Sequence, residues 1–210
     1  MNLDYQKTYW ENFSSSGEKN FLAKDLHDSW DDKSQSYTQT TEINPHILEI
    51  LKSETKMEFA LDFGVGMGRN FKYLQTLYKN VYGFDLPAMI RNARSLLNND
   101  QKLIDDWDFF RSRKFDLVYE SVVMQHIPPQ EVIHRLQCIS EMSPYFVSWT
   151  RSYNDYLRDF QAKKYGVNMA SLIKSTGSFE IVYCSLNENE ITNLMDETHY
   201  NILYKSKNFK

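Results

Sequence analysis

A glycine-rich turn that follows a short apolar run constrains the fold of this 210-residue chain more than any other feature. The segment Ala60–Asn70 reads ALDFGVGMGRN and carries Gly64, Gly66 and Gly68 at alternate positions. Glycine adopts positive φ and lets backbone amides approach a ligand closely. The pattern therefore indicates a buried strand, a tight turn and the start of a helix. A tight turn without a ligand would also explain the glycines, whose spacing is not the GxGxxG of a nicotinamide site.

An acid gives this turn its chemical character. Asp62 lies two residues before the first glycine, at the expected carboxyl end of the strand. A carboxylate at that place repels a pyrophosphate. We therefore expect a ligand that has a cationic or hydroxylated part.

The apolar pattern of the chain alternates between strand and helix. Helices are indicated from Asn44–Pro45, over 69–79, after Pro87, after Pro128–Pro129 and over 153–165, with a short polar helix between the last two strands. Strands are indicated at 59–62, 81–85, 102–104, 115–119, 145–149, 179–184 and 200–204. This order predicts a doubly wound α/β fold with a seven-stranded, mostly parallel sheet and helices on both faces. Ligands of such sheets bind outside the carboxyl ends of the strands.

The first 42 residues differ from the remainder. They are polar but carry seven aromatic residues, which argues against disorder, the alternative for so polar a stretch. We expect short helices joined by loops, forming an N-terminal cap over a pocket. The chain then divides into a cap segment, 1–42, and a ligand-binding domain, 43–210, within a single domain overall.

Bulk properties exclude several classes of function. A net charge of −4 argues against an extended nucleic-acid footprint, which usually needs a basic face. The two cysteines, Cys138 and Cys184, form no metal-binding pattern, so no metal is expected, and they suit a reducing cytoplasm. The N-terminus lacks the pattern of a signal peptide, and no apolar run is long enough to span a bilayer.

Further acids follow the next two expected strands. Asp85 ends the second strand and could accept both hydroxyls of a ribose, or it could cap the helix that begins near Pro87. Asp105 and Asp106 end the third strand, where a carboxylate could accept from an adenine amino group and the Trp107 indole could pack against a ring. A solvated acidic turn is the alternative at this place.

Three segments together resemble a known family. LDFGVGMGRN, VYGFDLPAMI and FDLVYESVVMQHIPP resemble, in order and at suitable spacing, motifs of the class I S-adenosylmethionine (SAM)-dependent methyltransferases. The resemblance covers roughly residues 45–150 and implies a Rossmann-like fold, SAM as the cofactor and S-adenosylhomocysteine (SAH) as the product. It places Asp62 near the methionine part, Asp85 at the ribose, and Asp105 or Asp106 at the adenine. The other cofactor contacts that we expect are Gly64, Gly66, Gly68, Arg69, Leu86, Trp107 and Glu120.

The fourth-strand motif narrows the acceptor. The chain lacks the Asn-Pro-Pro-Tyr or Asp-Pro-Pro-Tyr tetrapeptide of amino-methylating DNA enzymes, and the magnesium-binding acids of catechol-type enzymes. Glu120, Ser121, Gln125 and His126 stand there instead, which more closely resembles the small-molecule and glycan-tailoring branch. We expect methyl transfer to an oxygen of a small molecule or sugar. Alternatives are a protein or RNA methyltransferase, a SAM-binding relative without activity and, against the glycine spacing, a nicotinamide oxidoreductase.

Candidate residues near the acceptor come from the same motif, from the N-terminal cap and from the segment after the fifth strand. His126 is the candidate general base, since its ordinary pKa is about 6.5; ordering the loop is the alternative role. Glu120 is a second catalytic candidate that could hold the acceptor or the cofactor ammonium, or make a structural hydrogen bond. Aromatic and cationic side chains that could bind the acceptor, or simply pack, are Trp10, Trp149, Arg151 and Tyr153. The sequence does not indicate an oligomeric state.

Overall fold

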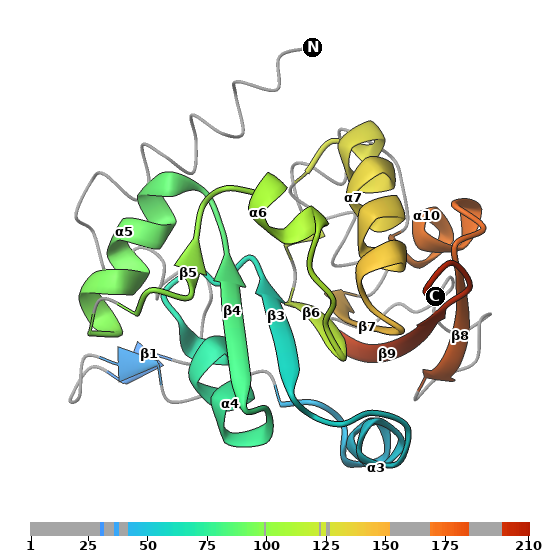
Figure 1. Ribbon diagram of the computed structural model, residues 1–210, viewed down its shortest axis with the longest axis horizontal. Helices are drawn as coiled ribbons and strands as arrows, with labels where there is room; N and C mark the ends of the chain where they lie inside the picture. The colour runs from blue at the N-terminus through green and yellow to red at the C-terminus, as the bar shows by residue number, and fades with distance from the viewer. Residues whose placement is uncertain are drawn as a thin grey trace.

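The structure is a computed structural model that describes residues 42–98, 100–121, 123–124, 127–151, 169–184 and 199–210, and two short strands at 30–31 and 36–37. In these described parts seven strands form one sheet in the order β5-β4-β3-β6-β7-β9-β8 (Figure 1). Their bounds are β3 Phe59–Phe63, β4 Asn80–Phe84, β5 Leu103–Ile104, β6 Leu117–Ser121, β7 Tyr145–Arg151, β8 Phe179–Cys184 and β9 His199–Ser206.

Pairing along the sheet is parallel from β5 to β7, and β9 lies antiparallel to both of its neighbours. From β3 the chain moves outward to β4 and β5, and then crosses to β6 on the other side of β3. The strand order therefore reverses between β3 and β6. In doubly wound sheets ligands bind at the carboxyl ends of the strands beside this reversal.

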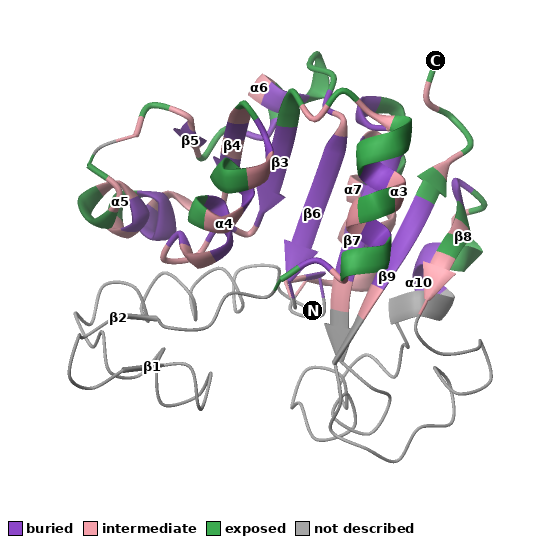
Figure 2. Cartoon of the chain, turned by 90° about the horizontal axis from the view of Figure 1, so that it is seen from below, coloured by how far each residue is buried: buried purple, intermediate pink, exposed green. Residues whose placement is uncertain are grey.

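Helices cover both faces of the sheet and bury two hydrophobic cores. One core joins α3 (Pro45–Glu54), α4 (Arg69–Leu77) and α5 (Pro87–Leu96) to the sheet. The other joins α6 (Asp108–Arg111), α7 (Pro129–Met142) and α10 (Met169–Ser175) to the opposite face. With helices on both faces, the central strands are enclosed: β6 is buried along its whole length (Figure 2).

Helix α3 shows how local sequence sets an element boundary. The Asn44 side chain accepts a hydrogen bond from the His46 amide at 2.9 Å, and Pro45 occupies the first turn. Both features stabilise a helix start, because the first amides of a helix have no partner within it. The predicted start of this helix is confirmed.

The predicted fold class is confirmed, while several boundaries differ. Strand β6 runs to Ser121, two residues beyond the prediction, and β5 has only two residues. The short helices α6 and α10 were not predicted. The predicted helices over 153–165 and between the last two strands lie outside the described residues.

The N-terminal expectation was wrong at the positions that the structure describes. Strands β1 (Trp30–Asp31) and β2 (Ser36–Tyr37) pair antiparallel, where short helices were expected. The remainder of 1–41 lies outside the described residues.

Among the helices that the structure describes, none has the length and apolarity needed to cross a membrane.

Candidate functional site

The glycine turn joins the end of β3 to the end of β4. The amides of Gly64 and Val65 donate to the Phe84 carbonyl at 2.8 and 3.0 Å, and the Gly68 amide donates to the Val65 carbonyl at 2.8 Å. Gly64, Gly66 and Gly68 all have positive φ, at 84°, 54° and 87°. The predicted tight turn is therefore present, and it places backbone amides at the carboxyl edge of the sheet.

The three glycines meet different surroundings. A Cβ at Gly64 would lie 2.1 Å from the Val123 side chain, and one at Gly68 would lie 2.4 Å from the Leu97 side chain. A Cβ at Gly66 would meet no atom within 4 Å. Close packing therefore requires glycine at the two outer positions, while the middle position faces open space in which a ligand could approach the backbone.

Asp62 is a buried acid without a partner. Its side chain is only 1% exposed, and neither carboxylate oxygen accepts a hydrogen bond from the residues that the structure describes. Burial, and next the nearby Asp85 carboxylate, raise the pKa of Asp62 to about 8, while the Arg69 guanidinium opposes the rise. An unpaired buried carboxylate is costly. A ligand that brings an ammonium or a hydroxyl donor would satisfy it.

Asp85 fastens the turn. One of its oxygens accepts the Gly66 amide and the other accepts the Leu86 amide, both at 2.7 Å. Burial raises the pKa of Asp85 to about 6, and these two hydrogen bonds act against the rise. Leu86, not Asp85, occupies the cap position of α5, so the capping alternative is not what the structure shows. Because a carboxylate can accept about four hydrogen bonds, Asp85 can still receive donors from a ligand.

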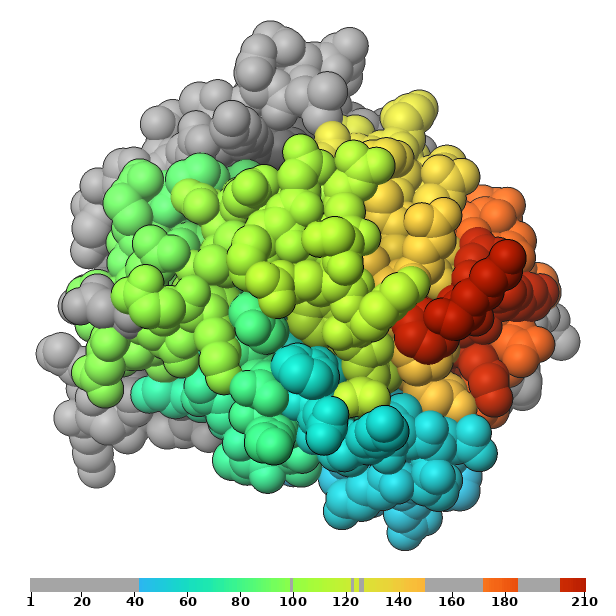
Figure 3. All heavy atoms as spheres, in the orientation of Figure 1, coloured from blue at the N-terminus to red at the C-terminus, as the bar shows by residue number. Residues whose placement is uncertain are grey.

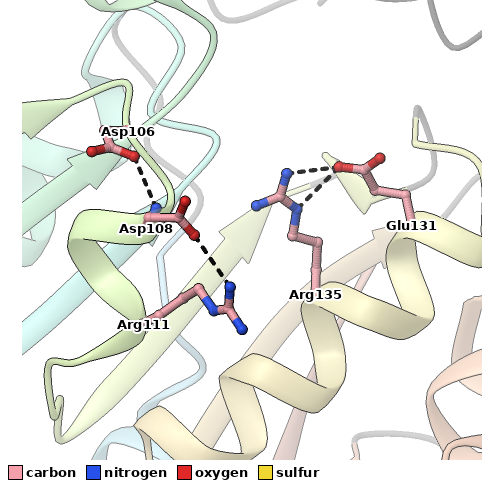
Figure 4. Close-up of polar contacts among 5 residues, drawn as sticks. All are labelled: Asp106, Asp108, Arg111, Glu131 and Arg135. Carbon is pink, nitrogen blue, oxygen red and sulfur yellow. Dashed lines mark hydrogen bonds and ion pairs between the residues drawn. The ribbon is translucent and has the colours of Figure 1, made fainter.

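The acids after β5 take two different roles. Asp106 accepts the Asp108 amide at 3.0 Å and thereby opens helix α6 (Figure 4). The side chain of Asp105 is exposed at the edge. Of the two candidates, Asp105 is thus the one whose carboxylate is not used in starting the helix.

Trp107 is a core residue. It is 9% exposed, and its ring lies 5.1 Å from Phe84, 5.5 Å from Phe63 and 6.1 Å from Phe110 between centroids. Its ring therefore lies in the hydrophobic core, where its buried Nε1 has no hydrogen-bond partner among the described residues. This placement does not support the expectation that the indole packs against a ligand ring.

Glu120 anchors the loop after β6. It is 1% exposed, one oxygen accepts the Ser148 hydroxyl, and the other accepts the Val123 amide at 2.9 Å and the Met124 amide at 3.5 Å. Burial raises the pKa of Glu120 and these hydrogen bonds lower it. Glu120 also pairs with Phe63 in register, so Asp62 points to the opposite face of the sheet. The geometry supports the structural alternative for Glu120.

The acceptor residues are described only in part. Gln125, His126, Trp10 and Tyr153 lie outside the described residues, and Arg151 is described only as the last residue of β7. Trp149 is half-buried and stands between Ser121 of β6 and Asn201 of β9 in the register of the sheet.

Asn201 was missed by sequence analysis. Its side-chain nitrogen donates to the Glu42 carbonyl at 3.2 Å, while its oxygen is buried without a partner among the described residues. A polar residue beside the apolar run Ile202–Tyr204 of the last strand was the signal that could have found it.

In the described parts of the chain no group of three or more His, Cys, Asp or Glu side chains could hold a metal ion.

Comparisons with known proteins agree with this geometry. A family model described as a methyltransferase domain matches residues 61–142, which hold the glycine turn, Asp85 and Glu120. No curated protein matches the chain.

Solved structures share the fold over most of the chain. The PH0226 protein from Pyrococcus horikoshii OT3 aligns with a TM-score of 0.60 and 16% identity over 91% of this chain and 100% of its own. Magnesium protoporphyrin IX methyltransferase from Synechocystis PCC 6803 with bound SAH aligns with a TM-score of 0.56 and 14% identity, over 96% of this chain and 100% of its own. The N-methyltransferase NodS from Bradyrhizobium japonicum WM9 in complex with SAH aligns with a TM-score of 0.55 and 13% identity, over 90% of this chain and 98% of its own. At these identities the likeness shows the fold.

Proposed function

We propose that this chain, a SAM-dependent methyltransferase with the class I fold, transfers a methyl group to an oxygen of a small molecule or sugar unit. The observation that carries the cofactor site is the buried, unpartnered carboxylate of Asp62 beside the glycine turn. The ammonium of a methionine moiety would satisfy that carboxylate. The hydrogen-bond donors of SAM thus match the acceptors that these residues offer.

The remaining cofactor contacts follow from the strand ends. Asp85, with Leu86 beside it, would accept the ribose hydroxyls, and the exposed Asp105 would accept from the adenine amino group. The backbone of Gly66 would contact the ligand directly, because no side chain stands between them. Asp106 and Trp107 would support this edge through α6 and the core.

The chain mainly supplies alignment and a path for one proton. SAM supplies an electrophilic methyl group when bound, and methyl transfer of this kind depends on proximity and in-line approach. His126 would take the proton from the acceptor hydroxyl at its imidazole nitrogen. Glu120 would act through the loop, because its carboxylate holds the amides of Val123 and Met124 just before His126.

Residues at the carboxyl end of β7 and beside it on the neighbouring strands would bind the acceptor. Ser121, Trp149 and Asn201 stand side by side in register across three strands. The buried oxygen of Asn201 could accept from an acceptor hydroxyl, and the half-buried Trp149 offers a ring. Arg151 is the candidate for a phosphate or carboxylate on the acceptor. Trp10 and Tyr153 are the further candidates.

Several features support this acceptor class over a polymer. The net charge is −4, and the chain lacks the tetrapeptide that grips a flipped base. We also propose that 1–42 is a cap over the acceptor, and that the protein, in which Cys138 and Cys184 form no disulfide, belongs to the cytoplasm.

The test is methyl transfer from SAM labelled at its methyl group. Three pools serve as acceptors: sugar nucleotides with hydroxylated aromatic compounds, total RNA, and unfolded protein. We expect label in a methyl ether of the first pool only. Label confined to RNA or protein would contradict the acceptor class, and SAH binding without transfer to any pool would favour a non-catalytic SAM-binding protein.

A further inference from the structure

A cation from α7 lies over two aromatic rings next to the candidate cofactor edge. The Arg135 guanidinium is 4.7 Å from the centre of the Trp107 ring and 5.7 Å from that of Phe84. One oxygen of Glu131, a turn earlier in α7, accepts from Arg135 Nη2 at 2.7 Å and from Nε at 3.2 Å (Figure 4). The Arg135 side chain is only 19% exposed. Glu131 therefore fixes a partly desolvated cation against two ring faces, where cation–π attraction is strongest.

Both rings adjoin residues of the cofactor edge. Phe84 immediately precedes Asp85, and its carbonyl accepts the amides of Gly64 and Val65. Trp107 follows the Asp105–Asp106 pair. A shift of either ring would thus move a carboxylate of the proposed nucleoside site.

Helix α6 is held by side-chain packing: Phe110 is fully buried, and its ring lies 5.8 Å from Phe84 and 6.2 Å from Phe115 between centroids. The helix spans four residues, far fewer than a helix needs to be stable by itself. The ion pair between Arg111 and Asp108 is 3.3 Å long and exposed, so it contributes little. The position of α6 depends instead on the packing of Phe110 and Trp107 against the core and α7. The atoms of α6 and those of α7 lie next to each other in Figure 3.

We propose that Arg135, held by Glu131, is a positioning residue that sets the nucleoside side of the cofactor site from outside it. It fixes the end of β4 and the start of α6, and through them the carboxylates of Asp85 and Asp105. This inference rests on the proposed function, since it requires a nucleoside at that edge.

The structure offers a matched control. The Arg113 guanidinium lies 4.0 Å from the centre of the Phe109 ring and 5.4 Å from that of Tyr82, so Arg113 makes the same kind of contact. Neither of those rings adjoins a candidate ligand-binding acid. Arg113 is exposed, and its two rings belong to β4 and α6 but do not directly precede or follow Asp85 or Asp105 in the chain. Arg113→Met therefore removes a cation–π contact from the same two elements and leaves Arg135 on Phe84 and Trp107.

The experiment is titration calorimetry of wild type, Arg135→Met, Arg135→Lys, Glu131→Gln and Arg113→Met, with thermal unfolding measured in parallel. The probes are SAH and 5′-methylthioadenosine, which keeps the nucleoside but lacks the amino-acid part. We expect Arg135→Met to bind both probes about three- to tenfold more weakly, in line with the loss of a desolvated cation–π contact. Arg135→Lys should recover most of the affinity, and Arg113→Met should bind both probes like wild type.

The possible results separate the alternatives. Wild-type affinity in Arg135→Met overturns the inference, and so does equal weakening in Arg135→Met and Arg113→Met, which would indicate general destabilisation. Weakening for SAH alone also overturns it, because the effect would then lie on the amino-acid side. If Arg135→Met does not fold, unchanged affinity in Glu131→Gln overturns the inference and a severalfold loss supports it. Failure of wild type to bind SAH refutes the proposed function instead.

Discussion

Cofactor binding should depend on pH because it must ionise Asp62. The unliganded carboxyl is buried and lacks a hydrogen-bond donor among the described residues, and its pKa is raised to about 8 by that burial. If a ligand ammonium pairs with the ionised carboxylate, binding releases a proton wherever the unliganded group is protonated. Affinity should therefore rise with pH up to about 8 and level off above it.

The size of the effect follows from the fraction ionised. With a pKa of about 8, about one tenth of Asp62 is ionised at pH 7 and about half at pH 8, so affinity should rise about fivefold between them. Asp85, whose pKa is raised by burial to about 6, is mostly ionised over this interval and adds little. Near pH 7 about one proton should leave per SAH bound.

Titration calorimetry with SAH in two buffers of different ionisation enthalpy measures the affinity and the proton count together. Asp62→Asn is the matched control, because the amide has the same shape and does not titrate. Titration of the ligand's own amino group is common to both proteins and cancels in their ratio. An affinity ratio that stays flat between pH 7 and 8, or no proton release at pH 7, would refute the reasoning.

Three further outcomes are expected. Gly64→Ala should lower the melting temperature more than Gly66→Ala, because only the first would drive a Cβ into Val123; equal melting temperatures would contradict the turn geometry. Asp85→Ala should weaken SAH binding at least tenfold, about 1.4 kcal/mol, since it loses the ribose contacts and the amide contact to Gly66; unchanged calorimetric affinity would remove this role. His126→Ala should reduce kcat on a true acceptor more than it weakens SAH binding, and an unchanged rate would rule out His126 as the base.

Local sequence predicted the turn and its acid because both depend on neighbouring residues. The glycine turn follows from three positions that adopt positive φ, and Asp62 is the last residue but one of the strand before it. The two-residue β5 and the four-residue α6 are too short to show a period, so α6 was missed.

The roles that the sequence left open depend on contacts between distant residues. Glu120 became a loop anchor because Ser148, on the neighbouring strand, and two amides reach it. Trp107 became a core residue because rings from β3, β4 and α6 surround it. The choice between Asp105 and Asp106 turned on one hydrogen bond to the Asp108 amide. Such pairings are set by the fold as a whole and leave no mark in the local pattern.

Titration of the purified full chain with SAH, beside NAD⁺ as the competing nucleotide, tests the central claim most directly. The account predicts one SAH bound per chain at micromolar concentrations and no heat from NAD⁺. Binding of NAD⁺ in preference to SAH, or no binding of SAH at millimolar concentrations, would contradict it.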